Sequence, residues 1–433
     1  TLLYYMSLLL SVVISILSFG AIANNDSINN AGAINRAIST CAQQGGGTVR
    51  VPAGTYVTGS IYLHSRVTLR LERGAILRGS ARLADYAPLQ TDMDLSRYES
   101  GQGTVNYNSA TDPQWSRALI FGVGIHHAGI EGPGHIDGAD VRNPLGEEHM
   151  RGPHTILLAG CSDMRFRDFS ITRSANYAIL AYQIDHTQFN ALTITGGWDG
   201  IHVRGACHIS ISRCALHTGD DALAGGYWTD TRIDRCLINS SCNGIRMIMP
   251  SERVYISRCR FEGPGTHPHH TSGRTATETG IYLQPGGWGK APGRMDQIYI
   301  DRCQMYNVLT PITVTLGDDN TAGTISINRL TGRQIGHMAL SVKSWGTAPT
   351  NQVIIRNSDI EYIGKDDRSL PEWFHDKSFD QWPFFPCWGM YFRNVHTVKL
   401  HQVKLRLSGK DYRQAILYDH VDHVQGHATL ATD

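Results

Sequence analysis

The chain has 433 residues, and its 39 Lys and Arg against 38 Asp and Glu give a formal net charge of +1. This balance argues against a nucleic-acid-binding protein, which usually carries a basic excess. Charged residues make up only 18% of the chain, while glycine accounts for 45 residues. Because disordered chains are more charged and less aromatic, we expect a large folded protein with many tight turns.

An apolar run from Leu8 to Leu17 lies near the start of the chain and precedes Ala21-Ile22-Ala23, a small-x-small pattern. This order is typical of a secretory signal peptide with cleavage after Ala23. A membrane anchor is less favoured, because roughly 15 apolar residues fall short of the ~20 that span a bilayer. We therefore expect a signal peptide over residues 1–23 and one domain over residues 24–433. The mature protein would be secreted or periplasmic, with no membrane attachment.

The segment from Asp26 to Gln44 carries apolar residues at helical spacing and runs into Gly45-Gly46-Gly47. This pattern predicts an amphipathic helix that ends at glycine. If the rest of the chain is a solenoid, such a helix can cover its exposed first layer.

Four later segments share one pattern, in which alternating apolar and polar residues lead to Arg-Cys: Ile209–Cys214, Thr231–Cys236, Val254–Cys259 and Ile298–Cys303. Their cysteines are separated by 22, 23 and 44 residues (236−214, 259−236 and 303−259). A fixed period in this range indicates a repeat architecture. We interpret the last interval as two periods, with one coil that lacks the cysteine.

The repeat unit has the alternation of β-strands rather than the spacing of helices. A coil of about 22 residues built from short strands is one turn of a parallel β-helix. We therefore predict an all-β solenoid of about ten coils between roughly Ala118 and the C-terminus, with a short N-terminal capping helix.

The cysteines would then stack inside the solenoid. Equivalent positions in successive coils lie about 4.8 Å apart, and free cysteine is among the most buried residue types. We expect Cys214, Cys236 and Cys259 to form an inward ladder. A disulfide between adjacent coils is the less favoured alternative.

Two acidic motifs carry the strongest functional signal: Trp198-Asp199-Gly200 and Gly219-Asp220-Asp221. Asp199 and Asp220 are 21 residues apart (220−199), which is one coil, so we expect the three carboxylates at one edge of neighbouring coils. Like charges at close range raise one another's pKa. Glycoside hydrolysis requires one protonated and one ionised carboxyl group. A calcium site and turn-forming aspartates remain alternatives.

Three further segments have weaker signals. Gly317-Asp318-Asp319-Asn320 is interpreted as a turn. His267, His269 and His270 lie in a loop-rich stretch, where exposed or groove-lining histidines are favoured over a metal-ligand set. The aromatic stretch from Asp366 to Trp388 is either a loop beside a groove or a packing flap.

From about Gly46 to Val308 the chain resembles the polygalacturonase family of glycoside hydrolases, family 28, within the pectin-lyase-like β-helices. The resemblance is carried by four segments: Gly46–Tyr56, Gly132–Gly138, Trp198–Gly200 and Gly219–Asp221. It implies a single-stranded right-handed parallel β-helix and a pectic or related plant or algal polysaccharide or oligosaccharide as substrate. It also implies no cofactor and no metal.

The resemblance places the family's catalytic aspartates at Asp199, Asp220 and Asp221. It implies an inverting mechanism, in which Asp220 is the general acid and Asp199 with Asp221 activates water. Trp198 belongs to the first motif and is a candidate substrate-binding residue.

Two departures from the family pattern concern the substrate. Asn243 stands where the family has a histidine, and Tyr282 and Gln284 stand where it has Arg and Lys to hold the sugar carboxylate. Arg246 comes more than one coil too early for that motif, although it could supply a cation from a different coil. We list Asn243, Arg246, Tyr282 and Gln284 as substrate-binding candidates. Because Tyr282 and Gln284 are uncharged, we expect a neutral sugar to be preferred and homogalacturonan to be a poor substrate.

Two other functions fit the same fold. A polysaccharide lyase would use Ca²⁺ and a basic residue, and a non-catalytic carbohydrate-binding β-helix would have lost its activity. The replaced histidine and cation favour the binding protein slightly, whereas the three aspartates favour the hydrolase.

Overall fold

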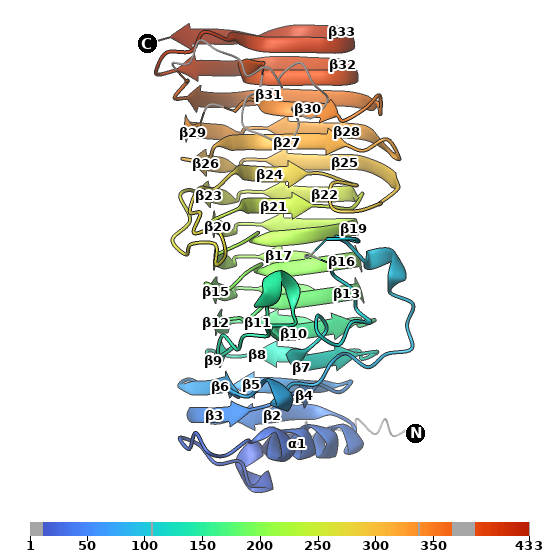
Figure 1. The fold of residues 1–433 in the computed structure, drawn as a ribbon, viewed down its shortest axis with the longest axis vertical. Helices are drawn as coiled ribbons and strands as arrows, with labels where there is room; N and C mark the ends of the chain where they lie inside the picture. The colour runs from blue at the N-terminus through green and yellow to red at the C-terminus, as the bar shows by residue number, and fades with distance from the viewer. Residues whose placement is uncertain (1–11, 105–106, 337, 366–385, 433) are drawn as a thin grey trace, which may run out of the picture.

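The computed structural model describes residues 12–104, 107–336, 338–365 and 386–432. In these ranges 33 strands are joined by parallel pairing into one continuous stack, with each coil lying on the one before it (Figure 1). The expected all-β solenoid is therefore confirmed. Most of the aromatic segment, residues 366–385, lies outside the described residues.

Each coil contributes strands to three parallel ladders. The first ladder, which will carry the site, contains β4 (Ile61–Tyr62), β7 (Ala118–Val123), β10 (His154–Ala159), β13 (Ile179–Asp185), β16 (Ile201–Cys207), β19 (Leu223–Asp234), β21 (Asn243–Met247), β24 (Thr279–Leu283), β27 (Thr310–Leu316), β30 (Leu340–Ser344), β32 (Cys387–Leu407) and β33 (Gln414–Thr432).

The second ladder contains β1 (Val12–Ser15), β2 (Gly47–Val51), β5 (Val67–Leu71), β8 (Gly129–Glu131), β11 (Arg165–Arg167), β14 (Gln188–Asn190), β17 (Ser210–Ser212), the second half of β19, β22 (Glu252–Ser257), β25 (Gly293–Asp301), β28 (Asn320–Asn328) and β31 (Thr350–Tyr362). The third contains β3 (Gly54–Thr58), β6 (Ala75–Gly79), β9 (His135–Asp137), β12 (Ser170–Thr172), β15 (Thr193–Thr195), β18 (Ala215–Thr218), β20 (Leu237–Ser240), β23 (Arg260–Glu262), β26 (Gln304–Tyr306) and β29 (Thr331–Ile335). The long strands β31, β32 and β33 continue both of these ladders.

Register along the first ladder separates the core from the outer surface. One column of paired residues is fully buried: Ile156, Ile179, Ile201, Leu223, Ile245, Ile281 and Ile312. Because successive side chains of a strand point to opposite faces, the next residue of each strand points outward. This outward column includes His202, Arg246 and Tyr282.

The cysteine ladder is confirmed and is longer than expected. Cys214, Cys236 and Cys259 are buried and free, and Cys303 follows directly after Cys259. The amide of Gln304 donates to the carbonyl of Cys259, and β23 pairs with β26. The interpretation of the 44-residue interval as two coils is therefore wrong. It is one coil, enlarged by excursions over residues 263–278 and 284–292. The disulfide alternative is not realised, because these thiols are free.

The predicted capping helix is α1 (Ala31–Gln43), and it covers the first layer of the solenoid (Figure 1). Its buried face consists of Ala33, Ile34, Ala37, Ile38 and Cys41. The helix begins later than expected because the side chain of Asn29 accepts from the amide of Ala31, while Asn30 bonds the backbone of Ile22 and Val57.

Residues from the second half of the predicted signal peptide belong to the same end of the fold. Strand β1 pairs in parallel with β2, and the following 3₁₀ helix η1 (Ile16–Phe19) contacts α1 and buries Ile16. Cleavage after Ala23 stays a prediction. No helix in the described part of the chain is long and apolar enough to cross a membrane.

Four excursions leave the coils on the side of the first ladder: residues 80–117, 138–153, 263–278 and 284–292. The first two contain the short 3₁₀ helices η2 (Leu83–Asp85), η3 (Ser96–Tyr98) and η4 (Glu147–His149). In Figure 1 the 80–117 excursion runs along the solenoid from the early coils to the level of β16. These excursions supply the walls of the site described below. The segment Gly317–Asn320 is a turn, as expected, closed by the amide of Asn320 on the carbonyl of Gly317.

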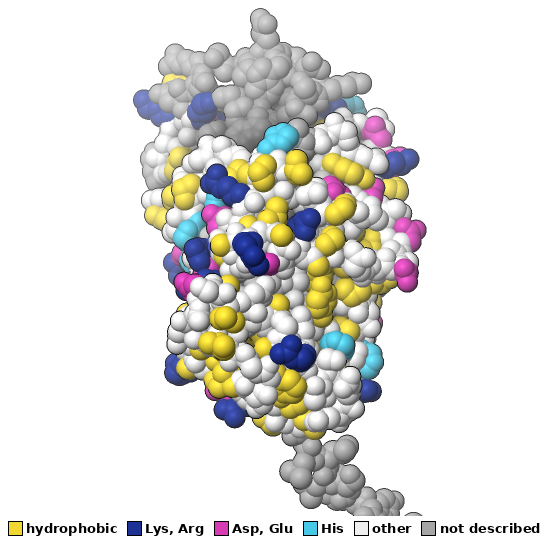
Figure 2. Space-filling model, turned by 60° about the horizontal axis from the view of Figure 1, so that its bottom comes forward, with side chains coloured by type: hydrophobic (Ala, Val, Ile, Leu, Met, Phe, Trp, Pro, Cys, Tyr) yellow, Lys and Arg dark blue, Asp and Glu magenta, His cyan; other side chains and the backbone are white. Residues whose placement is uncertain are grey.

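Basic and acidic side chains are interspersed on the face shown in Figure 2, without one large patch of a single sign. This distribution matches the balanced composition.

Candidate active site

The three aspartates lie together just before two neighbouring strands of the first ladder. Ile201 of β16 pairs with Leu223 of β19, so Asp199 and Asp221 occupy equivalent positions in adjacent coils. Equivalent positions are about one strand spacing apart. Asp220 comes immediately before this pair, and its side chain is 14% exposed, against 4% for Asp199 and 7% for Asp221.

A cavity of about 730 Å³ opens over these residues. Its walls include all three aspartates and four of the five predicted substrate-binding residues: Asn243, Arg246, Tyr282 and Gln284. Trp198 is not among its lining residues and is only 2% exposed. The guanidinium of Arg151 covers its ring at 3.7 Å from the ring centre, and His270 stacks on it at 5.0 Å. The ring of Trp198 therefore packs behind Arg151 in this structure, and its role in substrate binding stays a prediction.

A chain of hydrogen bonds orients Asp199. The Nε of Arg204, which can only donate, lies 2.9 Å from Nε2 of His202. That contact leaves the proton of His202 on Nδ1, which donates to Asp199 Oδ2 at 2.6 Å. Arg204 is itself held by the carbonyl of Tyr98 at 2.7 Å and by Asn108 at 2.8 Å.

Burial raises the pKa of Asp199 well above its usual value, and the charges of Asp220 and Asp221 raise it further. Burial lowers the pKa of His202 well below its usual value, and the nearby Arg204 lowers it further. The imidazole is therefore neutral and acts as a donor to the aspartate.

Asp220 has the opposite electrostatic environment. Burial alone would raise the pKa of Asp220, but the contacts of His269 and the positive charge of Arg151 lower it below its usual value. The Nη2 of Arg151 is 3.2 Å from Oδ2 of Asp220, and Nε2 of His269 is 3.6 Å from the same oxygen. Arg151 also pairs with Glu147 and Glu148 of the 138–153 excursion.

Asp221 is held by the residue that replaces the family histidine. The side-chain nitrogen of Asn243 donates to Asp221 Oδ1 at 2.8 Å, and its backbone amide donates to the same oxygen at 3.1 Å. Burial raises the pKa of Asp221, although Arg246, with Nη1 at 3.5 Å, opposes that shift. Asn243 thus positions a carboxylate, which is a role that needs no titratable group.

Arg246 brings a cation to the subsite from a different coil, the possibility that the sequence left open. It pairs in register with Tyr282 of the next coil, and its Nη2 donates to Gln284 Oε1 at 3.2 Å. Its guanidinium also lies 5.2 Å from the centre of the Trp288 ring. The premise that this subsite lacks a fixed positive charge is therefore wrong, because Arg246 reaches it from the neighbouring coil.

Several lining residues were not predicted from the sequence: Glu147, Arg151, His202, Arg204, Arg274 and Glu278. His202 and Arg204 could have been found, since they follow Asp199 at outward positions of β16. The others come from the excursions, which show no periodic signal. Of the three loop histidines, His269 lines the cavity, in agreement with the groove-lining interpretation.

The carboxylates also lie close to a thiol in an arrangement that could hold a metal ion. Oxygen atoms of Asp220 and Asp221 and the sulfur of Cys242 lie within 4.8 Å of one another. Calcium takes six to eight oxygen ligands, and a thiol is not one of them. Arg151 and Arg246 already place positive charge beside the two carboxylates. The arrangement therefore favours acid–base chemistry over calcium binding.

Two of the excursions meet beside the cavity. The amide of Gly101 donates to the carbonyl of Trp288 at 2.8 Å, which joins the 80–117 excursion to the 284–292 excursion. Asn108 and Trp288 both line the cavity from this wall. The joined segments therefore border the cavity on this side.

Comparison with known proteins agrees with this architecture. A family model described as a right-handed β-helix region matches residues 154–293. An exo-poly-α-D-galacturonosidase of Dickeya chrysanthemi is 25% identical over 259 residues, which is 49% of this chain and 41% of that enzyme. The chain spans about two fifths of the length of the curated relatives it matches.

Solved structures show the same fold at low sequence identity. An exopolygalacturonase from Thermotoga maritima has a TM-score of 0.58 and 16% identity, with 89% of this chain and 91% of that one covered. PfbA, a surface adhesin of Streptococcus pneumoniae, has a TM-score of 0.61 and 11% identity, with 94% and 91% covered. The right-handed parallel β-helix is thus shared by an enzyme and an adhesin, and function has to be argued from the site.

Proposed function

We propose that this protein is a glycoside hydrolase that cleaves a pectic or related plant or algal polysaccharide, with Asp199, Asp220 and Asp221 as its acid–base residues. The observation that carries the proposal is the pocket itself. Three carboxylates, two of them in equivalent positions of adjacent coils, meet there with Arg151 and Arg246. The similarity to the galacturonosidase of Dickeya chrysanthemi supports the same chemistry.

The geometry supports a division of labour among the aspartates. Asp199 and Asp221 form a pair one strand spacing apart that can hold one water molecule between them. Their raised pKa values make them strong bases once ionised. Asp220 has the most exposed side chain of the three and would protonate the glycosidic oxygen as the bond to the anomeric carbon breaks. Water would attack that carbon from the opposite face and give up its proton to the pair, so the configuration inverts.

The lowered pKa of Asp220 opposes its role as the general acid, because it favours the ionised carboxylate. A general acid must carry a proton when the bond breaks. A leaving-group oxygen that binds Asp220 would compete with Arg151 and His269 for the same carboxylate, and weakening those contacts raises its pKa. The role of Asp220 is therefore coupled to substrate binding, and it is tested separately below.

The name of the Dickeya enzyme describes release of sugars from a chain end. In this chain the 80–117 and 284–292 excursions, joined between Gly101 and Trp288, contribute Asn108 and Trp288 to the pocket lining. We therefore propose exo-action, with the terminal sugar on the side of these excursions.

Arg246 changes the expectation for the substrate. A buried carboxylate needs a paired cation, and Arg246 provides one beside Tyr282 and Gln284. We therefore propose that galacturonate is accepted in this pocket. The earlier preference for a neutral sugar rested on a missing cation.

Replacing Arg246 with Gln is expected to lower kcat/KM on oligogalacturonides by about 10- to 150-fold, the kinetic equivalent of one charge-assisted hydrogen bond of about 1.5–3 kcal/mol. The variant also removes the charge that opposes the raised pKa of Asp221. Because the base must be ionised, the acidic limb of the pH–rate profile should move to higher pH. Steady-state rates measured across pH would show both effects.

Arg294→Gln is the matched control, since this exposed arginine pairs with Asp296 outside the cavity. It should leave both quantities unchanged. Normal turnover of oligogalacturonides by Arg246→Gln would contradict the proposed recognition. A wild-type enzyme that cleaves neutral glycans but not oligogalacturonides would contradict it as well.

The proposal as a whole is tested by incubating the purified protein with homogalacturonan, rhamnogalacturonan and neutral side-chain glycans and separating the products. We expect a monosaccharide to accumulate from the start, without intermediate oligomers. Unsaturated products that absorb in the ultraviolet, with activity lost to a chelator, would indicate a lyase. Binding without cleavage of any glycan would indicate a carbohydrate-binding protein.

A further inference from the structure

A second cluster of reactive side chains lies at the opposite end of the same strands. Strands β13 and β16 end at Asp185 and Cys207, which pair in register, and each is followed by a histidine, His186 or His208. Both histidines have left-handed backbone conformations, with φ of 43° and 53°. The two imidazole rings stack with centres 4.4 Å apart.

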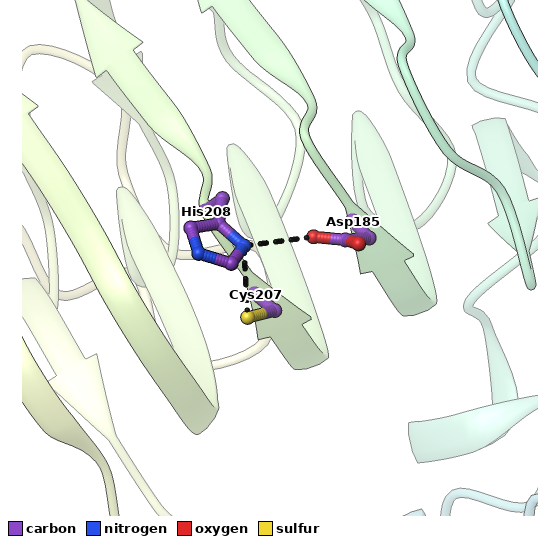
Figure 3. A group of neighbouring side chains, drawn as sticks. All are labelled: Asp185, Cys207 and His208. Atoms are coloured by element: carbon purple, nitrogen blue, oxygen red, sulfur yellow. Dashed lines mark hydrogen bonds and ion pairs between the residues drawn. The ribbon is translucent and has the colours of Figure 1, made fainter.

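The donor atoms of this cluster converge on a small volume. His208 Nδ1 lies 3.2 Å from Asp185 Oδ1 and 3.1 Å from Cys207 Sγ, as Figure 3 shows. The three ligand atoms are all within 4.8 Å of one another. His186 Nδ1 lies 2.9 Å from the same oxygen of Asp185. One imidazole, one carboxylate and one thiol therefore meet at the junction of two coils, with the ring of His186 stacked beside them.

These separations are those of a metal coordination shell. Zinc binds nitrogen and oxygen at about 2.0–2.2 Å and sulfur at about 2.3 Å in a tetrahedron, so neighbouring ligand atoms lie about 3.3–3.7 Å apart. The observed contacts differ from this range by a few tenths of an ångström, which small side-chain rotations can supply. A set that combines sulfur, imidazole and carboxylate suits zinc and similar transition metals and is unsuited to calcium or magnesium.

The surroundings support metal binding in two further ways. Asp230 Oδ2 lies 3.9 Å from Nε2 of His208. Histidines that bind a metal through one ring nitrogen commonly present the other to a carboxylate, which orients the ring. The cluster is also accessible, because Asp185 and Cys207 border a groove of about 620 Å³.

We propose that Asp185, Cys207 and His208 bind one Zn²⁺ ion or a similar divalent transition metal, with the fourth coordination position facing the groove. The ion would link two successive coils at the turns that follow β13 and β16. It would stabilise the folded chain in proportion to its affinity, since the unfolded chain does not hold these ligands together. This site is independent of the proposed hydrolase activity, because it lies at the other end of β16 from Asp199.

The test uses the full, untagged chain stripped of metal with a chelator. Zn²⁺ is titrated by calorimetry, and Co²⁺ is titrated by absorption spectroscopy. We expect one ion per chain, a thiolate-to-cobalt charge-transfer band, and a higher unfolding temperature in the presence of Zn²⁺. Cys207→Ser should abolish the charge-transfer band, and His208→Ala should weaken Zn²⁺ binding by at least about tenfold. Circular dichroism would confirm that both variants are folded.

His396→Ala is the control, because His396 pairs with Asp422 at 2.7 Å in an exposed position without a thiol. It should bind metal like the wild type. Absence of Zn²⁺ binding by the wild-type chain would overturn the proposal. Binding that survives Cys207→Ser but is lost in Cys242→Ser would place the ion at the aspartate cluster and overturn it as well.

Discussion

Replacing Asp220 with Asn is expected to lower hydrolysis of the polysaccharide by about 10²–10⁴-fold, the usual contribution of a general acid. The amide is nearly isosteric, and its oxygen can still accept from Arg151, whose Nη2 lies 3.2 Å from the native carboxylate. We therefore expect a normally folded protein that lacks the proton for the leaving group. Initial rates on oligogalacturonides, with circular dichroism as the check on folding, measure this effect.

A second substrate separates the acid from the base. An aryl glycoside with a good leaving group needs little protonation, so Asp220→Asn should recover most of its rate on such a substrate. Asp199→Asn should stay slow on both substrates, because water still requires activation. If Asp199→Asn recovered on the aryl glycoside and Asp220→Asn did not, the two roles would be exchanged. Asp199 would then be the general acid, in agreement with its raised pKa. Near-normal polysaccharide turnover by Asp220→Asn would remove Asp220 from the mechanism.

Replacing Arg151 with Met is expected to cost about 3–5 kcal/mol of folding free energy, because it leaves buried carboxylates without their partner. Arg151 is 4% exposed and contacts Glu147, Glu148 and Asp220. Denaturant unfolding of the two proteins gives the difference. Burial raises the pKa of Glu147, so this glutamate takes up a proton at a higher pH than usual. The destabilisation should therefore shrink as the pH is lowered.

Arg167→Met is the matched comparison. Arg167 makes a close contact with Glu131 on the surface, with nitrogen-to-oxygen distances of 2.8 and 3.0 Å. Its side chain is 55% exposed, and exposed pairs contribute only about 0–1 kcal/mol. Equal losses in the two variants would contradict the view that the carboxylate cluster depends on Arg151 for its stability.

The features of the fold that repeat were accessible from the sequence. The inward cysteines and the meeting of Asp199 with Asp220 and Asp221 follow from residue spacing, since equivalent positions of a solenoid stack. The capping helix follows from apolar residues at helical spacing. The same reasoning failed for the interval from Cys259 to Cys303. One coil can contain long loops, so the number of residues between two positions does not give the number of coils between them. Two long excursions fit into one coil there without disturbing the pairing of β23 with β26.

The chemistry of the pocket depends on those excursions. Arg151 and His269 reach Asp220 from segments without periodic signal. Residue counting places Arg246 more than one coil too early for the family motif, yet Arg246 and Tyr282 are paired residues of adjacent strands. Residue spacing likewise places Trp198 next to Asp199 but does not show that Arg151 covers its ring.

The central claim is that the three aspartates catalyse inverting hydrolysis at a chain end. Proton NMR of the first product released from an α-linked oligogalacturonide tests it most directly. We expect galacturonate monomer that appears first as the β-anomer and then equilibrates with the α-anomer. Initial release of the α-anomer, formation of an unsaturated product, or no release from any pectic substrate would contradict it.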